Sequence, residues 1–348
     1  LMNPTRIAVA GAGYIGLAHI EVIRQNPLCT LSAIVDPTPA SRDIAASMGA
    51  RHFKSLDELL AQDRPDGVVL ATPNALHVPQ ALQCLEQGLP ILLEKPIAPT
   101  LAEALQLVEA VETQQGKILI GHHRAHSPIM AKAREVIASG QLGKLVAVMG
   151  SATFYKPDSY FEDGPWRKEP GGGPLLLNMI HEVHNLRILC GEIVAVQAFA
   201  SHAAREFAVE DTVAISLQFA SGALGTFMLS DTAACARSWE QTSQENKAYP
   251  SYGDEDCYVV TGTRGSLSVP TMRLKTYPRP EDSSWWKPFE SSTVAMVRDD
   301  PLKHQIAHFV QVIQGHAEPL VSARDGMLNL RVTEAIVQAA REGRTVQI

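Results

Sequence analysis

The stretch ILLEKPIAP, residues 91–99, places a carboxylate, an ammonium group and a proline directly after an apolar run. The apolar run is typical of a buried strand, and open α/β sheets bind ligands beyond the carboxyl ends of their strands. At such a position Lys95 can hydrogen-bond a reacting oxygen and stabilise the negative charge that develops on it. A surface pair of Glu94 and Lys95 would contribute little and would need no particular position. The residues alone leave both interpretations open.

A second group of polar residues lies on the otherwise apolar helix predicted at 174–189, within GGGPLLLNMIHEVHNLRILCG. Asn178, His181 and Asn185 fall on one face of this helix, and His184 adjoins that face. Polar groups in an apolar setting need partners, which a substrate can supply. Imidazole titrates near neutrality and therefore suits proton transfer in both directions. The ordinary alternative is a histidine that finds its partners inside the core.

The segment VAGAGYIG carries a nucleotide-binding pattern, with Gly11, Gly13 and Gly16 between a strand and a helix. These glycines permit a tight turn, a close approach of the backbone to a pyrophosphate and close packing of helix on strand. Asp36 ends the second strand, where an acid can accept hydrogen bonds from both ribose hydroxyls and repel a 2′-phosphate. NAD is therefore favoured over NADP, although Arg42 is close enough in sequence to pair with such a phosphate.

The pattern up to residue 124 alternates short apolar strands with helices, which predicts a doubly wound Rossmann domain with a parallel sheet. The predicted strands lie at 6–10, 31–36, 67–72, 90–94 and 117–121. The predicted helices lie near 15–25, 40–48, 56–62, 76–87 and 101–115.

From residue 125 the regular alternation of strands and helices ends. Residues 125–348 are predicted to form an α+β domain for substrate binding and oligomerisation. Strands follow one another without intervening helices, which indicates a mostly antiparallel sheet. These strands are predicted at 144–154, 193–202, 210–219, 223–230, 256–261 and 265–269, with helices near 128–139, 174–189, 301–314 and 325–342 and a long loop at 233–256.

The composition narrows the class of protein. A chain of 348 residues, 45% of them hydrophobic, suits two packed domains. A net charge of −7 with scattered Lys and Arg argues against a nucleic-acid partner, and no apolar run approaches the roughly 20 residues of a membrane span. Five widely spaced cysteines favour reduced thiols, and the early strand pattern leaves no room for a signal peptide, so we expect a cytoplasmic protein.

Four motifs in order, VAGAGYIG, ATPNALH, GLPILLEKPIA and the long helix motif, resemble the Gfo/Idh/MocA family of NAD(P)-dependent oxidoreductases. This family includes inositol dehydrogenases and glucose-fructose oxidoreductase. The resemblance implies that Lys95 lies beside the nicotinamide, followed by a proline that is commonly cis. It also implies that His181 takes or gives the proton of the reacting carbinol. The matching motifs imply cofactor contacts for Gly11, Gly13, Tyr14, Ile15, Gly16, Asp36, Thr72, Pro73, Asn74, His77, Glu94 and Lys95.

The sequence departs from the family pattern at two positions. Polyol dehydrogenases of the family usually carry aspartates where this chain has Leu177 and His184. The substrate pocket is therefore expected to be less acidic. Basic residues near the domain junction and before the catalytic helix suggest a substrate with a carboxylate or a similar anion, unless they are simply solvated. The expected substrate-binding residues are His123, Arg124, Trp166, Arg167, Asn178 and His184.

The predicted function is NAD-dependent hydride transfer to or from a secondary alcohol of a polyol, sugar or hydroxylated ring acid. The alternatives are a catalytically silent NAD(P)-binding regulator of the same fold and a dihydrodiol dehydrogenase. His181 and His184 have a spacing that metal ligands can use, but no clear third ligand follows, so no metal is expected. A homodimer or homotetramer through the C-terminal sheet is expected, because few helices are available to cover both sheet faces.

Overall fold

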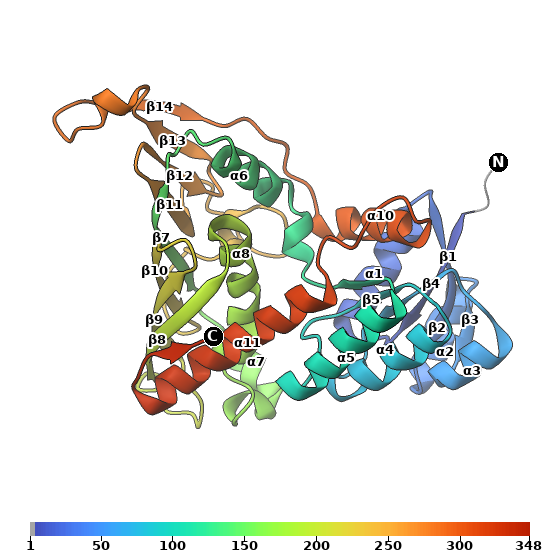
Figure 1. Ribbon diagram of the computed structural model, residues 1–348. Coiled ribbons are helices and arrows are strands. Elements are labelled where there is room, and N and C mark those ends of the chain that lie inside the picture. Colours follow the sequence, from blue (N-terminus) through green and yellow to red (C-terminus); the bar gives the residue numbers. More distant parts are fainter. Residues whose placement is uncertain (1–3) are drawn as a thin grey trace. The chain divides into compact units, whose positions relative to one another are not determined.

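The computed structural model describes residues 4–348, and the chain forms two compact units (Figure 1). The first unit runs to His126 and includes Pro301–Leu330. The second unit consists of Ser127–Asp300 and Arg331–Ile348. Across residues 4–348, no helix combines the length and the apolar character needed to cross a membrane.

The first unit is built on a six-stranded parallel sheet in the order β3-β2-β1-β4-β5-β6, which confirms the predicted Rossmann fold. Its strands are β1 (Thr5–Ala10), β2 (Cys29–Val35), β3 (Arg51–Phe53), β4 (Gly67–Leu70), β5 (Ile91–Leu93) and β6 (Ile118–Ile120). The connecting helices are α1 (Tyr14–Gln25), α2 (Pro39–Ser47), α3 (Leu56–Gln62), α4 (His77–Glu86) and α5 (Leu101–Gln114). The strand order reverses between β1 and β4, which is where ligands bind in sheets of this kind.

The two C-terminal helices are α10 (Pro301–Ile313) and α11 (Ala323–Glu342). Helix α10 packs in the core of the first unit, and α11 contributes to the cores of both units. Phe309 of α10 is fully buried in the core of the first unit, and Met327 and Leu330 in the first turns of α11 are buried in the same core. Ile336, later in α11, is fully buried in the core of the second unit. The chain therefore returns to the first unit after residue 300, a return that the linear division at residue 124 does not include.

The second unit contains a nine-stranded sheet in the order β14-β13-β12-β11-β7-β10-β9-β8-β15. Only the pair of β7 and β10 is parallel, which confirms the predicted, mostly antiparallel sheet. The strands are β7 (Leu145–Thr153), β8 (Ile193–Ser201), β9 (Thr212–Phe219), β10 (Leu224–Ser230), β11 (Tyr258–Gly262), β12 (Gly265–Val269), β13 (Arg273–Thr276), β14 (Glu290–Thr293) and β15 (Val346–Gln347).

Helices α6 (Pro128–Ala138) and α8 (Ile180–Cys190) pack on one face of this sheet, as Figure 1 shows. Short helices lie in the connections, including α7 (Asp158–Glu162) and α9 (Trp239–Thr242), the second inside the segment predicted as a long loop. Alternate residues of each strand point to the core, which makes the inner face of the sheet apolar. In β9, for example, buried and exposed residues alternate.

Candidate functional site

The glycine loop after β1 has the geometry that a dinucleotide site needs. Gly11 has φ of +93°, and a Cβ there would collide with the carbonyl of Ala71, which follows β4. A Cβ on Gly16 would collide with the carbonyl of Gly11, so helix and loop can pack this closely only without a side chain. A Cβ on Gly13 would meet open space, and Gly13 precedes α1 without a side-chain cap. The backbone N–H groups at this helix start are therefore available to a phosphate, and the loop fits a dinucleotide.

Asp36 directly follows β2 and supports this loop. One carboxylate oxygen accepts a hydrogen bond from the N–H of Ala12 at 2.9 Å, and the other accepts from the N–H and the hydroxyl of Thr38. Partial burial opposes ionisation, but these hydrogen bonds outweigh it and lower the pKa of Asp36. The residue is therefore a carboxylate at neutral pH, whereas Arg42 is exposed on α2.

Two further turns follow β4 and β5 at the same edge of the parallel sheet, and His77 joins them. Nδ1 of His77 lies 2.7 Å from the carbonyl oxygen of Pro96, and Nε2 lies 2.9 Å from that of Thr72. The ring is 1% exposed, and the peptide between Lys95 and Pro96 is cis. His77 therefore links two of the predicted cofactor-binding turns, whereas its own contact with the cofactor stays a prediction.

The other predicted cofactor residues lie on the exposed side of the same loops. Tyr14 is 86% exposed at the start of α1, Ile15 is half-buried, and Pro73 and Asn74 are exposed after β4. The hydroxyl of Thr72 lies 2.6 Å from the amide oxygen of Gln80. The carboxyl ends of β1, β4 and β5 thus bring these residues to one edge of the sheet.

Glu94 points away from solvent and pairs with a histidine of the first helix. Its Oε1 lies 2.6 Å from Nε2 of His19, and the two residues are 6% and 0% exposed. A Cβ on Gly121 would lie 2.9 Å from the Glu94 carboxylate, so a glycine makes room for it. Burial opposes ionisation of Glu94, but the hydrogen bond from His19 and the charges of His19, His123 and Lys95 lower its pKa. A buried carboxylate therefore precedes Lys95 in the chain, and its Oε2 accepts a hydrogen bond from the backbone N–H of Lys95.

The buried pair of Glu94 and His19 gives a prediction about stability. Glu94→Ala should lower the free energy of unfolding at neutral pH by about 3 kcal/mol, because it leaves the ring of His19 buried without its acceptor. Folding lowers the pKa of Glu94, so its contribution is present above the unfolded pKa and is lost as the pH falls through the folded value. Urea unfolding at several pH values should show the difference between variant and wild type shrinking in acid.

A matched control is Glu112→Ala, since Glu112 pairs with Arg324 at 2.6 Å but the side chains are 53% and 58% exposed. Its cost should stay below about 1 kcal/mol. Equal losses in the two variants, or a Glu94 effect that persists unchanged in acid, would contradict the assigned role of the buried pair.

In the second unit, the predicted helix at 174–189 begins as a π-helical turn, η4 (Leu175–Met179), and continues as α8. Such turns widen a helix and are frequent at functional sites. Asn178 lies in η4, and His181 in the first turn of α8 is only partly buried. His184 is 5% exposed, and Asn185 is fully buried with its Nδ2 3.3 Å from the hydroxyl of Tyr258. Asn185 therefore serves the core of this unit, while Asn178 and His181 keep some exposure.

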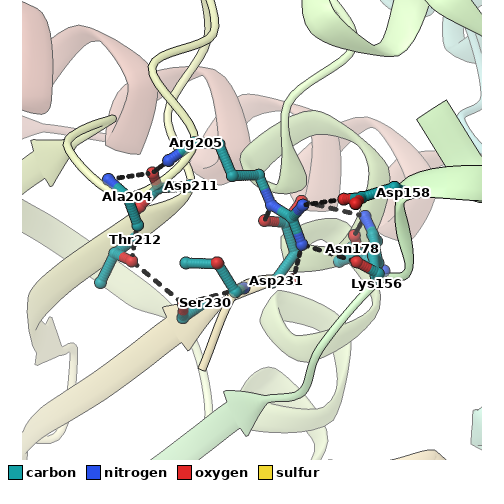
Figure 2. A network of polar contacts seen from close by, with 10 residues as sticks. Lys156, Asp158, Asn178, Ala204, Arg205, Asp211, Thr212, Ser230 and Asp231 are labelled. Atoms are coloured by element: carbon teal, nitrogen blue, oxygen red, sulfur yellow. Dashed lines mark hydrogen bonds and ion pairs between the residues drawn. The ribbon is translucent and has the colours of Figure 1, made fainter. Parts of the chain in front are cut away.

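The residues that hold Asn178 are not among those predicted from the sequence. Lys156, three residues past β7, donates from Nζ to Oδ1 of Asn178 at 2.8 Å, and this ammonium group lies 3.5 Å from a carboxylate oxygen of Asp231 (Figure 2). Asp231 directly follows β10, the parallel neighbour of β7, so both residues leave the sheet at the same end. No sequence signal marks the pair, because 75 residues separate its members and neither lies in a motif.

The start of η4 has its own acceptor, which the sequence analysis also missed. Oε1 of Glu210 accepts a hydrogen bond from the N–H of Leu175 at 2.9 Å. A carboxylate at a helix start satisfies a backbone donor and favours the helix dipole. Burial nevertheless raises the pKa of Glu210. Glu210 thus fixes the turn from which Asn178 projects.

The remaining predicted substrate residues are found in both units. In the first unit, His123 and Arg124 lie in η2 (His123–His126), and Arg124 is 4% exposed. In the second unit, Trp166 is 55% exposed in η3 (Pro165–Lys168), and the guanidinium of Arg167 lies 3.9 Å from the ring centre of Tyr160. Trp166 and Arg167 thus lie with Lys156 and Asn178 in one unit, whereas His123 and Arg124 lie with Lys95 in the other.

Two family profiles match nearly the whole chain. The oxidoreductase family profile for the NAD-binding Rossmann fold matches residues 5–122, and the profile for the C-terminal alpha/beta domain matches residues 134–348. The chain is 27% identical to a 1,5-anhydro-D-fructose reductase of Ensifer adhaerens, covering 84% of this chain and 83% of that protein. It is 26% identical to an inositol 2-dehydrogenase of Rubrobacter xylanophilus, covering 97% and 91%.

A solved structure agrees with this assignment. The aldose-aldose oxidoreductase of Caulobacter crescentus superposes with a TM-score of 0.77 at 25% identity, covering 99% of this chain and 100% of that one. The structure supports the same assignment, since the glycine loop and the sheet order are those of a Rossmann fold and lie within the first matched domain. The chain belongs to the Gfo/Idh/MocA family of NAD(P)-dependent oxidoreductases.

Proposed function

We propose that the protein oxidises a secondary alcohol of a polyol, sugar or hydroxylated ring acid, and catalyses the reverse reduction. The observation that supports this best is the place of Lys95, directly after β5 at the sheet edge that carries the glycine loop. Two relatives that match most of the chain are named 1,5-anhydro-D-fructose reductase and inositol 2-dehydrogenase. An ammonium group at this edge can stabilise negative charge on a reacting oxygen, which a lysine elsewhere on the surface cannot do.

In this proposal His181 takes the proton of the substrate hydroxyl, because imidazole at neutral pH is basic enough to accept it and acidic enough to return it. Lys95 donates a hydrogen bond to the same oxygen and stabilises its developing negative charge. Glu94, held by His19, keeps a negative charge next to Lys95 and favours its protonated form. Bound nicotinamide supplies the chemistry of accepting the hydride from the carbinol carbon.

The test is to incubate the protein with a panel of polyols, aldoses and hydroxylated ring acids and with NAD or NADP. The rate of cofactor reduction is measured from the near-ultraviolet absorbance of reduced nicotinamide. Turnover with any member, lost in a Lys95→Ala variant, would support the proposal. A protein that binds the cofactor but reduces it with no member would instead fit the alternative, a catalytically silent regulator of the same fold. Dihydrodiols belong in the panel, since their selective oxidation would favour the third interpretation.

The cofactor preference follows from Asp36. We expect NAD to bind at least about tenfold more tightly than NADP, a difference of about 1.4 kcal/mol, because an ionised Asp36 repels a 2′-phosphate. Asp36→Ala should bring the two affinities together when they are measured by quenching of protein fluorescence. Equal affinities in the wild type would contradict this and would point to Arg42 as a phosphate partner.

We also propose that a second copy of the chain covers the outer face of the nine-stranded sheet. This face exposes Met149, Phe199, Leu224 and Met228, which are 55%, 75%, 59% and 44% exposed. Apolar patches of this kind mark interaction surfaces. Sedimentation at micromolar concentration should show a dimer or tetramer, which Met228→Lys should shift toward monomer. Val297→Lys is the control, since Val297 is 79% exposed outside the strands, and a monomeric wild type would contradict the proposal.

A further inference from the structure

Four charged side chains of the second unit, Lys156, Arg167, Arg205 and Asp231, form what we call the Lys156 cluster. Arg205 binds Asp231 twice, from Nε to Oδ1 at 3.1 Å and from Nη2 to the carbonyl oxygen at 2.7 Å. Nη2 of Arg205 also donates to the carbonyl oxygen of Lys156 at 2.7 Å (Figure 2). Arg205 therefore ties the segments after β7 and β10 together, and its charge is balanced by Asp231.

The charges of this cluster do not balance. Lys156 shares Asp231 with Arg205, and the side chain of Asp231 is only 3% exposed. Asp158 is 3.9 Å from Arg205 but 87% exposed, so its charge is largely screened. Within residues 4–348, no carboxylate forms an ion pair with Arg167, whose Nε is buried without a hydrogen-bond partner. Three cations thus lie around one buried carboxylate, that of Asp231, while the nearby carboxyl of Glu210 accepts from the N–H of Leu175.

Aromatic rings hold the two uncompensated cations near each other. The guanidinium of Arg167 lies 3.9 Å, and the ammonium group of Lys156 4.9 Å, from the ring centre of Tyr160. Arg167 also donates from Nη1 to the carbonyl oxygen of Tyr160. Such contacts orient the cations without neutralising them. Burial lowers the pKa of Lys156, and although Asp231 opposes this, the positive charges of Arg205 and Arg167 add to it.

The cluster is joined to the predicted catalytic helix. Nζ of Lys156 donates to Oδ1 of Asn178, which lies in η4, one turn before His181. Glu182 of this helix accepts a hydrogen bond from the hydroxyl of Tyr258, and Glu210 accepts one from the N–H of Leu175, so both acidic residues have donors of their own. The side chain of Lys156 keeps 11% of its surface exposed.

We propose that the substrate carries a carboxylate, which Lys156 and Arg167 bind beside Tyr160 while Asn178 orients Lys156. The substrate class is then a hydroxy acid of the sugar or ring type, with the carboxylate on the same molecule as the oxidised alcohol. This inference rests on the proposed dehydrogenase function. Charge-assisted hydrogen bonds of this kind contribute about 1.5 to 3 kcal/mol each, which corresponds to about tenfold to hundredfold in affinity.

The experiment uses two pairs of ligands with closely related skeletons, D-glucuronate with D-glucose and quinate with myo-inositol. Binding to the protein with NADH present is measured by titration calorimetry, and turnover with NAD is measured separately. We expect at least one acid to bind at least about tenfold more tightly than its neutral partner, and Lys156→Met to remove that preference. Lys132→Met, at an exposed pair with Glu135, should preserve it.

The outcomes separate this inference from the proposed function. Equal affinity for acid and neutral partners, an acid preference that survives in Lys156→Met, or no binding of either acid would overturn the carboxylate site even if neutral alcohols are oxidised. Binding of an acid that depends on Lys156 without any turnover would support the site and count against the dehydrogenase. A glucose phosphate that binds more tightly than glucuronate would overturn the assignment to a carboxylate in favour of a phosphate.

Discussion

His181→Ala is expected to lower kcat by about 10² to 10⁴, because that is the usual cost of losing a general base. NAD affinity should change little, since the glycine loop and Asp36 belong to the first unit and His181 belongs to the second. Stopped-flow measurement of nicotinamide reduction gives the rate, and fluorescence titration gives the cofactor affinity.

The control for this variant is His202→Ala. His202 is exposed in the second unit, and its Nδ1 lies 2.9 Å from the carbonyl oxygen of Phe207. Its removal should leave the rate within about twofold, since exposed substitutions usually have small effects. A His181→Ala enzyme that turns over as fast as this control would assign the proton transfer to another group.

Lys95→Ala should lower kcat and also raise KM, since in the proposed mechanism the ammonium group contacts the substrate oxygen in both the ground state and the transition state. The loss in kcat/KM should reach about 10² to 10³, the usual cost of removing one donor to a developing oxyanion. Steady-state kinetics over a range of substrate concentrations separates the two effects. A change in KM alone would reduce Lys95 to a binding residue.

A conservative variant tests how Lys95 acts. Lys95→Arg keeps a cation but changes its shape and its donors, so it should restore binding of the substrate better than it restores kcat. Glu94→Gln should lower kcat as well, because it removes the buried negative charge next to Lys95 while preserving the shape of the side chain. If Glu94→Gln leaves kcat unchanged, the pair with His19 has a purely structural role.

Much of the first unit could be predicted from its sequence because its determinants are local. The strands are continuous apolar runs, and the glycine loop and the Glu94–Lys95 turn are short segments whose positions follow from the strand ends. β3 was missed, since only Arg51–Phe53 form it and three residues carry no periodicity. The contact of Phe309 with this core could not be predicted, because it depends on packing between segments that Ser127–Asp300 separate in the chain.

The second unit was harder to predict for the same reason. The structure confirms the helix at 174–189 but divides its polar face. Asn185 contacts Tyr258, whereas Asn178 contacts Lys156. The π-helical turn η4 alters the spacing that an α-helix would give. Lys156 and Asp231 meet only because β7 and β10 are parallel neighbours, which no local pattern encodes.

The most direct test of the central claim is the pH dependence of single-turnover hydride transfer in the wild type and in His181→Ala. If His181 is the base, the wild-type rate should fall in acid with a midpoint in the range where imidazole ordinarily titrates, about pH 6.5. That acid limb should disappear in His181→Ala, together with most of the rate. A variant that keeps both the acid limb and most of the turnover would contradict the assignment of His181 and would leave Lys95 as the base.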